Sequence, residues 1–182
     1  HPKLRELIRS DLFDYGDVLD DLRDYDACFF CLGVSATGMG EAAYHRVTFE
    51  LTVAAAESLG GLNPALTFCY VSGEGTDSTE WGRLMWARVK GKTENQLLRM
   101  PLDAYMFRPG FIQPLRGVRS KTRVYQAIYR VLGPFYPLLK RLMPKHVTTA
   151  VNMGRAMIEV AAQGYTKRVL ENPDINSLAV AV

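Results

Sequence analysis

The stretch ALTFCYVSG, residues 65–73, is a short apolar run that stops at a glycine. The run ACFFCLG, residues 27–33, has the same form, and AYMFRPG, residues 104–110, stops at a Pro-Gly pair. Short continuous apolar runs that end at such turn signals are typical of strands buried on both faces of a parallel sheet. These three runs therefore predict the central strands of the fold.

The segments between the three runs have helical patterns. Residues 41–60 end at a Gly-Gly pair, which predicts a helix C-cap, and residues 80–100 end before Pro101. Strands that alternate with helices through short loops indicate βαβ units with right-handed crossovers. We therefore expect an α/β fold, with one doubly wound and mainly parallel sheet in a single domain over residues 1–182.

The two ends of the chain give weaker patterns. Residues 4–9 predict a strand, and the apolar spacing within residues 14–26 predicts a short helix after it. Towards the other end, residues 149–163 predict a helix and residues 168–172 predict a final short strand.

Residues 111–147 form a basic, aromatic and proline-punctuated segment. The surrounding residues 104–158 contain ten Lys and Arg but no Asp or Glu. We interpret residues 111–147 as a helical substrate-side segment within the domain, whose apolar face packs on the core while its basic rim is solvated. The alternative is an anionic partner, either a phosphorylated or CoA-linked substrate or a membrane surface bound through an interfacial helix.

The composition is that of a soluble globular protein. The chain has 182 residues, of which 48% are hydrophobic and 23% charged, enough for a sizeable core. No apolar run reaches the roughly 18 to 20 residues that cross a bilayer, and early charged residues argue against a signal peptide. A net charge of only +3, without a recognised binding motif, argues against nucleic acid as a partner. The three cysteines suit a reducing compartment, so we expect a cytoplasmic protein.

Two of the cysteines, Cys28 and Cys31, form a C-x-x-C pair inside an apolar run. Residues three apart on a strand point to opposite faces, so the two thiols are not placed to chelate a metal together. We expect both to be core cysteines and predict no metal site.

Polar residues at the strand ends are the first candidates for chemistry. Ligands of doubly wound sheets bind at the carboxyl ends of the strands, and Ser72 directly follows one of the apolar runs. Its hydroxyl is expected to project into the crevice and hydrogen-bond a substrate oxygen. Lys90, on the next predicted helix, is expected to hold ribose hydroxyls there and to lower the pKa of a nearby phenol. The alternatives are an ordinary strand-terminating serine and a solvated lysine.

Four stretches together resemble a known family: DACFFCLG, TFCYVSGEGTD, WARVKGKTE and YMFRPGFIQP. They look like the atypical short-chain dehydrogenase/reductases, in the NAD-dependent epimerase/dehydratase-like branch that includes the Tat-interacting-protein oxidoreductases. The resemblance covers roughly residues 4–175, and its motifs are moderately specific in combination.

The resemblance implies a Rossmann-like fold with a site for NADP(H) or NAD(H). It implies that Ser72 is the catalytic serine and that Lys90 binds the nicotinamide ribose. It also implies that four residues contact the adenine side of the cofactor, namely Asp11, Leu12, Leu32 and Gly33. A turn beside the nicotinamide is implied for Arg108, Pro109, Gly110 and Phe111.

The sequence departs from the family pattern at two points. Trp86 stands where the family has its catalytic tyrosine, four residues before Lys90. An indole N–H does not titrate in water, so Trp86 cannot act as a general acid or base. We expect Trp86 to cover the nicotinamide end of the pocket while Lys90 holds the ribose. The glycine-rich phosphate loop is also absent from these residues, and we expect it within about 45 residues upstream of His1.

Three further groups are weaker candidates for proton transfer. Tyr70 alternates with the serine on one strand face. Asp77 in the following loop is a carboxylate base if the loop folds inward; the alternative is that it is solvated or caps the following helix. Tyr136 and Lys140 repeat the tyrosine–lysine spacing, but Pro137 follows the tyrosine, which favours an accidental match.

The function expected from these features is an NAD(P)-binding oxidoreductase or epimerase-like enzyme in which Trp86 replaces the catalytic tyrosine. The alternative is a non-catalytic dinucleotide-binding sensor or scaffold protein. The expected partner is a small-molecule substrate. Peripheral membrane contact is less favoured, and homo-oligomerisation is left open.

Overall fold

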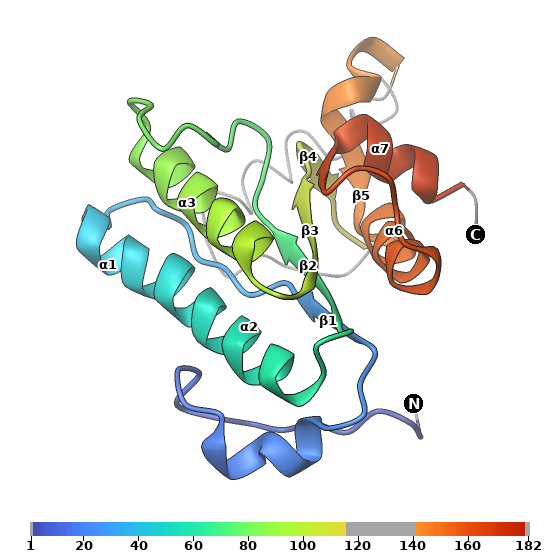
Figure 1. Cartoon of the computed structure of the whole chain (residues 1–182). Coiled ribbons are helices and arrows are strands. Elements are labelled where there is room, and N and C mark those ends of the chain that lie inside the picture. Colours follow the sequence, from blue (N-terminus) through green and yellow to red (C-terminus); the bar gives the residue numbers. More distant parts are fainter. Residues whose placement is uncertain (1, 116–140, 181–182) are drawn as a thin grey trace.

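A four-stranded parallel sheet forms the centre of the computed structural model, which describes residues 2–115 and 141–180 (Figure 1). The strand order is β1-β2-β3-β6. The bounds are β1 (Ala27–Phe30), β2 (Thr67–Val71), β3 (Asp103–Arg108) and β6 (Val169–Glu171). Thr67 of β2 lies opposite Ala27 on one side and Asp103 on the other, and every pairing is parallel. The three central strands and the last short strand are therefore confirmed.

Both faces of this sheet are covered, which is why its strands are continuous apolar runs. The covering helices are α2 (Leu51–Leu62) and α3 (Met85–Arg99) on one face and α6 (Ala150–Gln163) on the other. Phe68 and Tyr70 of β2 pack in the core under α2 and α3, whereas Cys69 between them packs in the core with α6. Alternate residues of one strand thus enter two cores, as in a doubly wound α/β fold, and the predicted fold class is confirmed.

The helix predicted over residues 41–60 is continuous but irregular. It consists of α1 (Glu41–His45), a π-helical turn (Arg46–Glu50) and α2. The predicted stop at the Gly-Gly pair is wrong, because the helix continues through both glycines to Leu62. A Cβ on Gly60 would lie 2.7 Å from Leu102 Cδ2. The glycine therefore allows close packing of the helix on Leu102.

The N-terminal prediction is also wrong. Residues 4–9 form no strand, and the following helix is a 3-10 helix over Gly16–Leu22. The Arg9 guanidinium donates to the carbonyl oxygens of Asp11 and Asp14 at 3.1 and 2.6 Å. These bonds tie Arg9 to the backbone of residues 11–14, while residues 4–9 have no regular secondary structure.

Two short strands and a last helix were not anticipated by the sequence pattern. Strands β4 (Phe111–Gln113) and β5 (Val147–Thr149) pair in parallel as a separate two-stranded sheet. They are the two ends of the predicted substrate-side segment 111–147, and residues 116–140 between them lie outside the described part of the chain. The last helix, α7 (Asn172–Leu178), begins with a capping box formed by Glu171 and Asp174.

The predicted helix 149–163 is confirmed as α6. Its first turn is capped by Thr149, whose hydroxyl accepts from Asn152 N at 3.0 Å. Across the residues that the model describes, none of the helices is both long and apolar enough to cross a membrane.

Candidate functional site

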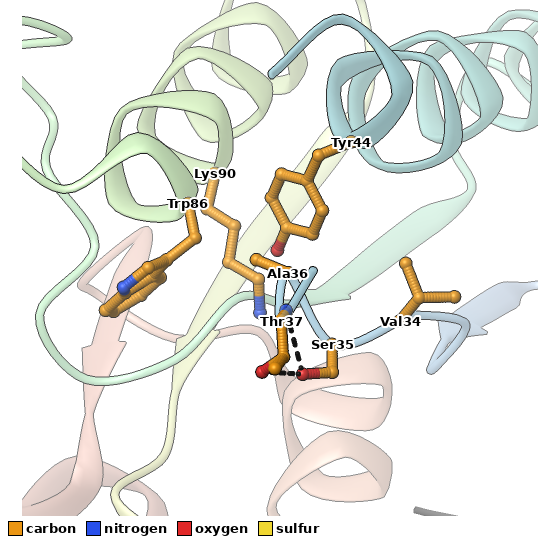
Figure 2. Close-up of a pocket in the computed structure, with 7 residues that line it drawn as sticks. All are labelled: Val34, Ser35, Ala36, Thr37, Tyr44, Trp86 and Lys90. Carbon is orange, nitrogen blue, oxygen red and sulfur yellow. Dashed lines mark hydrogen bonds between the residues drawn. The ribbon is translucent and has the colours of Figure 1, made fainter. Parts of the chain in front are cut away.

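A pocket of about 300 Å³ opens at the carboxyl ends of the parallel strands, between the loop after β1 and the helices α1 and α3 (Figure 2). It is lined by Val34, Ser35, Ala36, Thr37, Tyr44, Trp86 and Lys90. This is the end of the sheet where doubly wound folds bind their ligands. The volume lies at the lower end of the range for small-molecule sites.

Lys90 and Trp86 reach this pocket from α3, one helical turn apart, as the sequence predicted. The position of α3 depends on close contact with the loop that follows β2. A Cβ on Gly91 would lie 1.8 Å from the carbonyl oxygen of Asp77. Asp77 N donates to Ala87 O at 3.1 Å. Only glycine at position 91 therefore allows the loop to lie against the helix.

Asp77 organises the turn before α3 and is not directed at the pocket. Its carboxylate accepts from the Thr79 hydroxyl at 2.6 Å and from Gly82 N at 2.6 Å. These bonds, the Thr79 hydroxyl first, lower the pKa of Asp77. Because the turn occupies residues 77–82, α3 begins at Met85 and not at the predicted residue 80. Asp77 does not cap α3, whose N-cap residue is Leu84, and its carboxylate instead binds groups within the turn 77–82.

Lys90 combines burial with a charged neighbour. Its Nζ donates to the carbonyl oxygen of Ser72, and Nζ lies 3.9 Å from where a Cβ of Gly73 would stand. Burial lowers the pKa of Lys90 to about 8, against the opposing effect of the Glu94 charge. An ammonium group has three donors, so Lys90 can bind a ligand oxygen in addition to the Ser72 carbonyl.

Trp86 lies on the side of Lys90 away from Tyr44 (Figure 2). Its indole is half-buried, and its Cη2 atom would lie 3.4 Å from a Cβ on Gly75. Gly75 has a φ of +83°, which favours glycine. The ring therefore packs over the loop after β2 and forms one wall of the pocket.

Three hydroxyl-bearing pocket residues, Ser35, Thr37 and Tyr44, were not predicted from the sequence, nor were the apolar lining residues Val34 and Ala36. Ser35 and Thr37 follow β1, and the Ser35 hydroxyl donates to Thr37 Oγ1 at 2.9 Å. Tyr44 is only 2% exposed and comes from α1, with its hydroxyl directed towards the loop that Lys90 also approaches (Figure 2). Their position in the sequence could have indicated them. Hydroxyl groups in the loop and first helical turn after a buried strand lie at the carboxyl end of the sheet, where ligands bind.

Ser72 lies at the predicted strand end, but its side chain is not presented to the pocket. It is 5% exposed, and its hydroxyl lies 2.5 Å from Glu94 Oε1 and 3.1 Å from the carbonyl oxygen of Phe107. The expected projection into the crevice is therefore not what the structure shows. The buried carboxylate of Glu94, on helix α3, binds the hydroxyl. The catalytic role of Ser72 stays a prediction.

Glu94 is itself 1% exposed and is neutralised by Arg108. Arg108 Nε lies 3.0 Å from Glu94 Oε1, and the guanidinium also pairs with Oε2. The same guanidinium reaches Ser78 Oγ at 2.5 Å and Glu171 Oε1 at 3.3 Å. These bonds, with Glu94 first, raise the pKa of Arg108. We call Ser72, Glu94 and Arg108 the buried ion-pair network.

The rest of the predicted nicotinamide turn lies beside this network. Pro109 O accepts from Glu74 N at 2.9 Å, and Gly110 N donates to Asn172 Oδ1 at 3.1 Å. A Cβ on Gly110 would lie 2.2 Å from the carbonyl oxygen of His146. Phe111 begins β4. The turn is therefore packed tightly against the C-terminal part of the chain and does not line the pocket of Figure 2.

The predicted adenine-side residues do not line this pocket either. Leu32 and Gly33 immediately precede the lining residue Val34. Leu12 packs on the core next to α2, and the Asp11 carboxylate accepts from Phe13 N at 2.8 Å. The structure thus places two of the four next to the pocket, and their contact with a nucleotide stays a prediction.

The other candidates are accounted for by their surroundings. Tyr70 is 2% exposed, and burial, the largest effect, raises its pKa above the usual value of a phenol. Tyr136 and Lys140 lie outside the described residues. Cys28 packs on the core and burial raises its pKa to about 12, whereas Cys31 is exposed, so the expectation of a core position is wrong for Cys31.

Two solved structures share this architecture. One is the structure of RMD from Pseudomonas aeruginosa complexed with NADPH, which is 14% identical with a TM-score of 0.61. The other is the crystal structure of UDP-N-acetylglucosamine 4-epimerase from Bacillus cereus, which is 15% identical with a TM-score of 0.59. Each match covers 91% of this chain and 67% of the other chain. No protein-family model and no curated protein sequence matches the chain.

At such low identity the two structures establish the fold. The chain has an α/β, Rossmann-like fold with the parallel sheet β1-β2-β3-β6, and it shares this fold with an NADPH-complexed protein and an epimerase. The pocket at the carboxyl ends of its strands lies where such folds bind their ligands.

Proposed function

We propose that the protein binds NADP(H) or NAD(H) and acts as an oxidoreductase or epimerase-like enzyme of the atypical short-chain dehydrogenase/reductase type. The observation that carries this proposal is the pocket in which Lys90 meets the hydroxyl-bearing loop after β1. The complex of RMD with NADPH supports it by analogy of fold. A small-molecule substrate is the partner that fits a pocket of about 300 Å³.

The groups present fit the nicotinamide-ribose half of a dinucleotide. A ribose needs hydrogen-bonding partners for its hydroxyls, and Lys90, Ser35 and Thr37 offer them around one cavity. The same residues do not fit a pyrophosphate, because among the lining residues described Lys90 is the only cation. A pyrophosphate is usually held by backbone N–H groups of a glycine-rich loop at a helix N-terminus.

The roles of the α3 residues follow from their placement. Lys90 would hold the ribose, while Trp86 would cover the nicotinamide end and exclude water without transferring a proton. A bound nicotinamide supplies hydride chemistry, and the protein must supply orientation and a proton. For Ser72 to polarise a substrate oxygen, as the family resemblance implies, its hydroxyl would have to leave Glu94.

The alternative function, a non-catalytic sensor or scaffold protein that binds the dinucleotide, is favoured by one observation. Trp86 stands where the family that the sequence resembles has its proton-donating tyrosine, and an indole does not titrate. The two functions make the same prediction for binding and opposite predictions for turnover.

A calorimetric titration of the full-length protein with NADPH and with NADH tests the dinucleotide binding that both functions require, and NADPH turnover then separates them. Lys90→Met should weaken binding of the preferred dinucleotide by about 1 to 3 kcal/mol, the range for a hydrogen bond from a charged donor. Lys92→Met is the matched control, because Lys92 lies on the same helix but outside this pocket and should bind normally. No binding by the wild type, or equal binding by both variants, would contradict the proposal.

A further inference from the structure

A second helix brings an ionisable hydroxyl into the pocket that Lys90 occupies. Tyr44 comes from α1 and Lys90 from α3, and both line the same cavity. Figure 2 shows Lys90 between Trp86 and Tyr44, with its Nζ and the Tyr44 hydroxyl both directed towards the loop that contains Ala36 and Thr37. The residue one turn before Lys90 cannot give up a proton, but the residue facing Lys90 from the other helix can.

The position of Tyr44 is fixed by its surroundings. The side chain is 2% exposed although it lines a cavity, so its ring is packed on most sides and only a small part meets the pocket. Helix α1 ends one residue later and continues into the π-helical turn Arg46–Glu50. Single π-helical turns within helices occur frequently at functional sites. The phenol is therefore held in place before any ligand binds.

We propose that Tyr44 supplies the proton to the substrate oxygen in this pocket, in place of the tyrosine that residue 86 lacks. This inference rests on the proposed dinucleotide-dependent function. The neighbouring Lys90 supports it, because its ammonium group lines the same pocket and can stabilise negative charge that develops on a substrate oxygen there. With a pKa of about 8, Lys90 is largely charged at neutral pH.

Reduction of a carbonyl group illustrates the step. The carbonyl carbon receives a hydride from the reduced nicotinamide, and the π pair of the C=O bond moves to oxygen. This oxygen takes the proton of Tyr44 as the phenol O–H bond breaks, and the phenolate regains a proton from solvent. Overall, one carbonyl group, one reduced dinucleotide and one proton are consumed, and one alcohol and one oxidised dinucleotide are formed.

Tyr70 provides the comparison that separates a pocket phenol from a buried one. Both tyrosines are 2% exposed, but Tyr70 lies on β2 in the core and does not line the pocket. Removing either hydroxyl deletes one buried polar group, so Tyr70→Phe controls for the structural effect of Tyr44→Phe.

The test uses the full-length protein with NADPH and para-nitrobenzaldehyde as a carbonyl probe. Tyr44→Phe should slow NADPH oxidation by about 10²- to 10⁴-fold, the usual contribution of a general acid. Its NADPH affinity by calorimetry should be unchanged, and Tyr70→Phe should leave the rate near that of the wild type. In the NADP⁺-saturated protein, Tyr44→Phe should weaken binding of para-nitrobenzyl alcohol by about 2- to 12-fold through the lost hydrogen bond.

Each remaining outcome counts against a defined claim. An unchanged rate in Tyr44→Phe, or a wild type that binds NADPH but leaves the aldehyde unreduced, overturns the role of Tyr44 alone. A wild type that does not bind NADPH contradicts the proposed function and removes this inference with it. If Tyr44→Phe fails to fold, 3-fluorotyrosine at position 44 keeps the hydroxyl but makes it more acidic, and it should change the rate where the same replacement at position 70 does not.

Discussion

The pocket and the buried ion-pair network lie at the same end of the sheet, yet their polar groups are used differently. In the pocket, Lys90 keeps donors available next to a cavity of about 300 Å³. In the network, the Ser72 hydroxyl and the Arg108 guanidinium are bound to Glu94, which is inaccessible to solvent. A polar residue at this end of the sheet can therefore be available to bind a ligand, as Lys90 is, or it can be bound to another side chain, as Ser72 is to Glu94.

The energetic demands of the two regions also differ. A buried carboxylate such as Glu94 is tolerated only with a partner, because an isolated charge in the interior is very costly. A pocket lysine is costly to bury as well, and the protein partly avoids this cost through the lowered pKa of Lys90. Changes in the network should therefore affect stability, whereas changes in the pocket should affect ligand binding.

The largest effect is expected from Arg108→Met. It leaves Glu94 buried without its cationic partner, so the free energy of unfolding should fall by about 3 to 5 kcal/mol. Urea denaturation followed by circular dichroism measures this. The control is Arg23→Met, which breaks an exposed pair with Asp20 and should cost about 1 kcal/mol or less. Equal losses in the two variants would show that the network is not buried as described.

The next effect is that of Ser72→Ala. Removing a hydrogen bond to a charged group should lower the free energy of unfolding by about 1.5 to 3 kcal/mol, while Glu94 keeps its bonds to Arg108. NADPH affinity should stay at the wild-type value. Intact stability together with a large loss of turnover would reverse the assignment and place Ser72 in the catalytic machinery, as the family resemblance implies.

Gly91→Ala should act on the pocket through the loop. The added Cβ would overlap the Asp77 carbonyl, so the loop must move, at a cost of about 1 to 3 kcal/mol in unfolding free energy. Because the loop carries Gly73 and Gly75 past Lys90 and Trp86, NADPH affinity should fall as well. Gly154→Ala is the control, since a Cβ there meets nothing within 4 Å. Normal affinity in Gly91→Ala would show that the loop does not set the pocket.

The last effect is the pH dependence carried by Lys90. Its folded pKa of about 8 lies below the ordinary lysine value, so between these two values the unfolded chain binds more protons than the folded chain. The free energy of unfolding therefore rises as the pH increases above about 8. Below that pH, Lys90 is charged in the folded protein and the full cost of burying its charge is present. Relative to Lys90→Met, the wild type should gain stability as the pH is raised from 7 to 10. A constant difference in urea midpoints across that range would contradict a lowered pKa.

The order and type of the main elements could be predicted from the amino-acid sequence because they depend on local patterns. Apolar runs such as residues 65–73 must be buried on both faces, and helices must connect them if the strands are parallel. The same patterns failed at Gly60, whose role is set by the distant Leu102. They also failed at residues 4–9, which have no regular secondary structure and join neither sheet. Strands β4 and β5 lie at the two ends of segment 111–147, which its sequence pattern led us to interpret as helical, and they pair only in the tertiary structure.

Pocket membership was decided by tertiary structure. Lys90 could be placed from its position on a helix, but Ser72 and Glu94, which are 22 residues apart, show their bond only when β2 and α3 pack together. Tyr44 and Lys90 come from separate helices, and no spacing along the chain signals that they face one cavity. The physical reason is that local sequence fixes the direction of a side chain relative to its own element, whereas its neighbours depend on how whole elements pack.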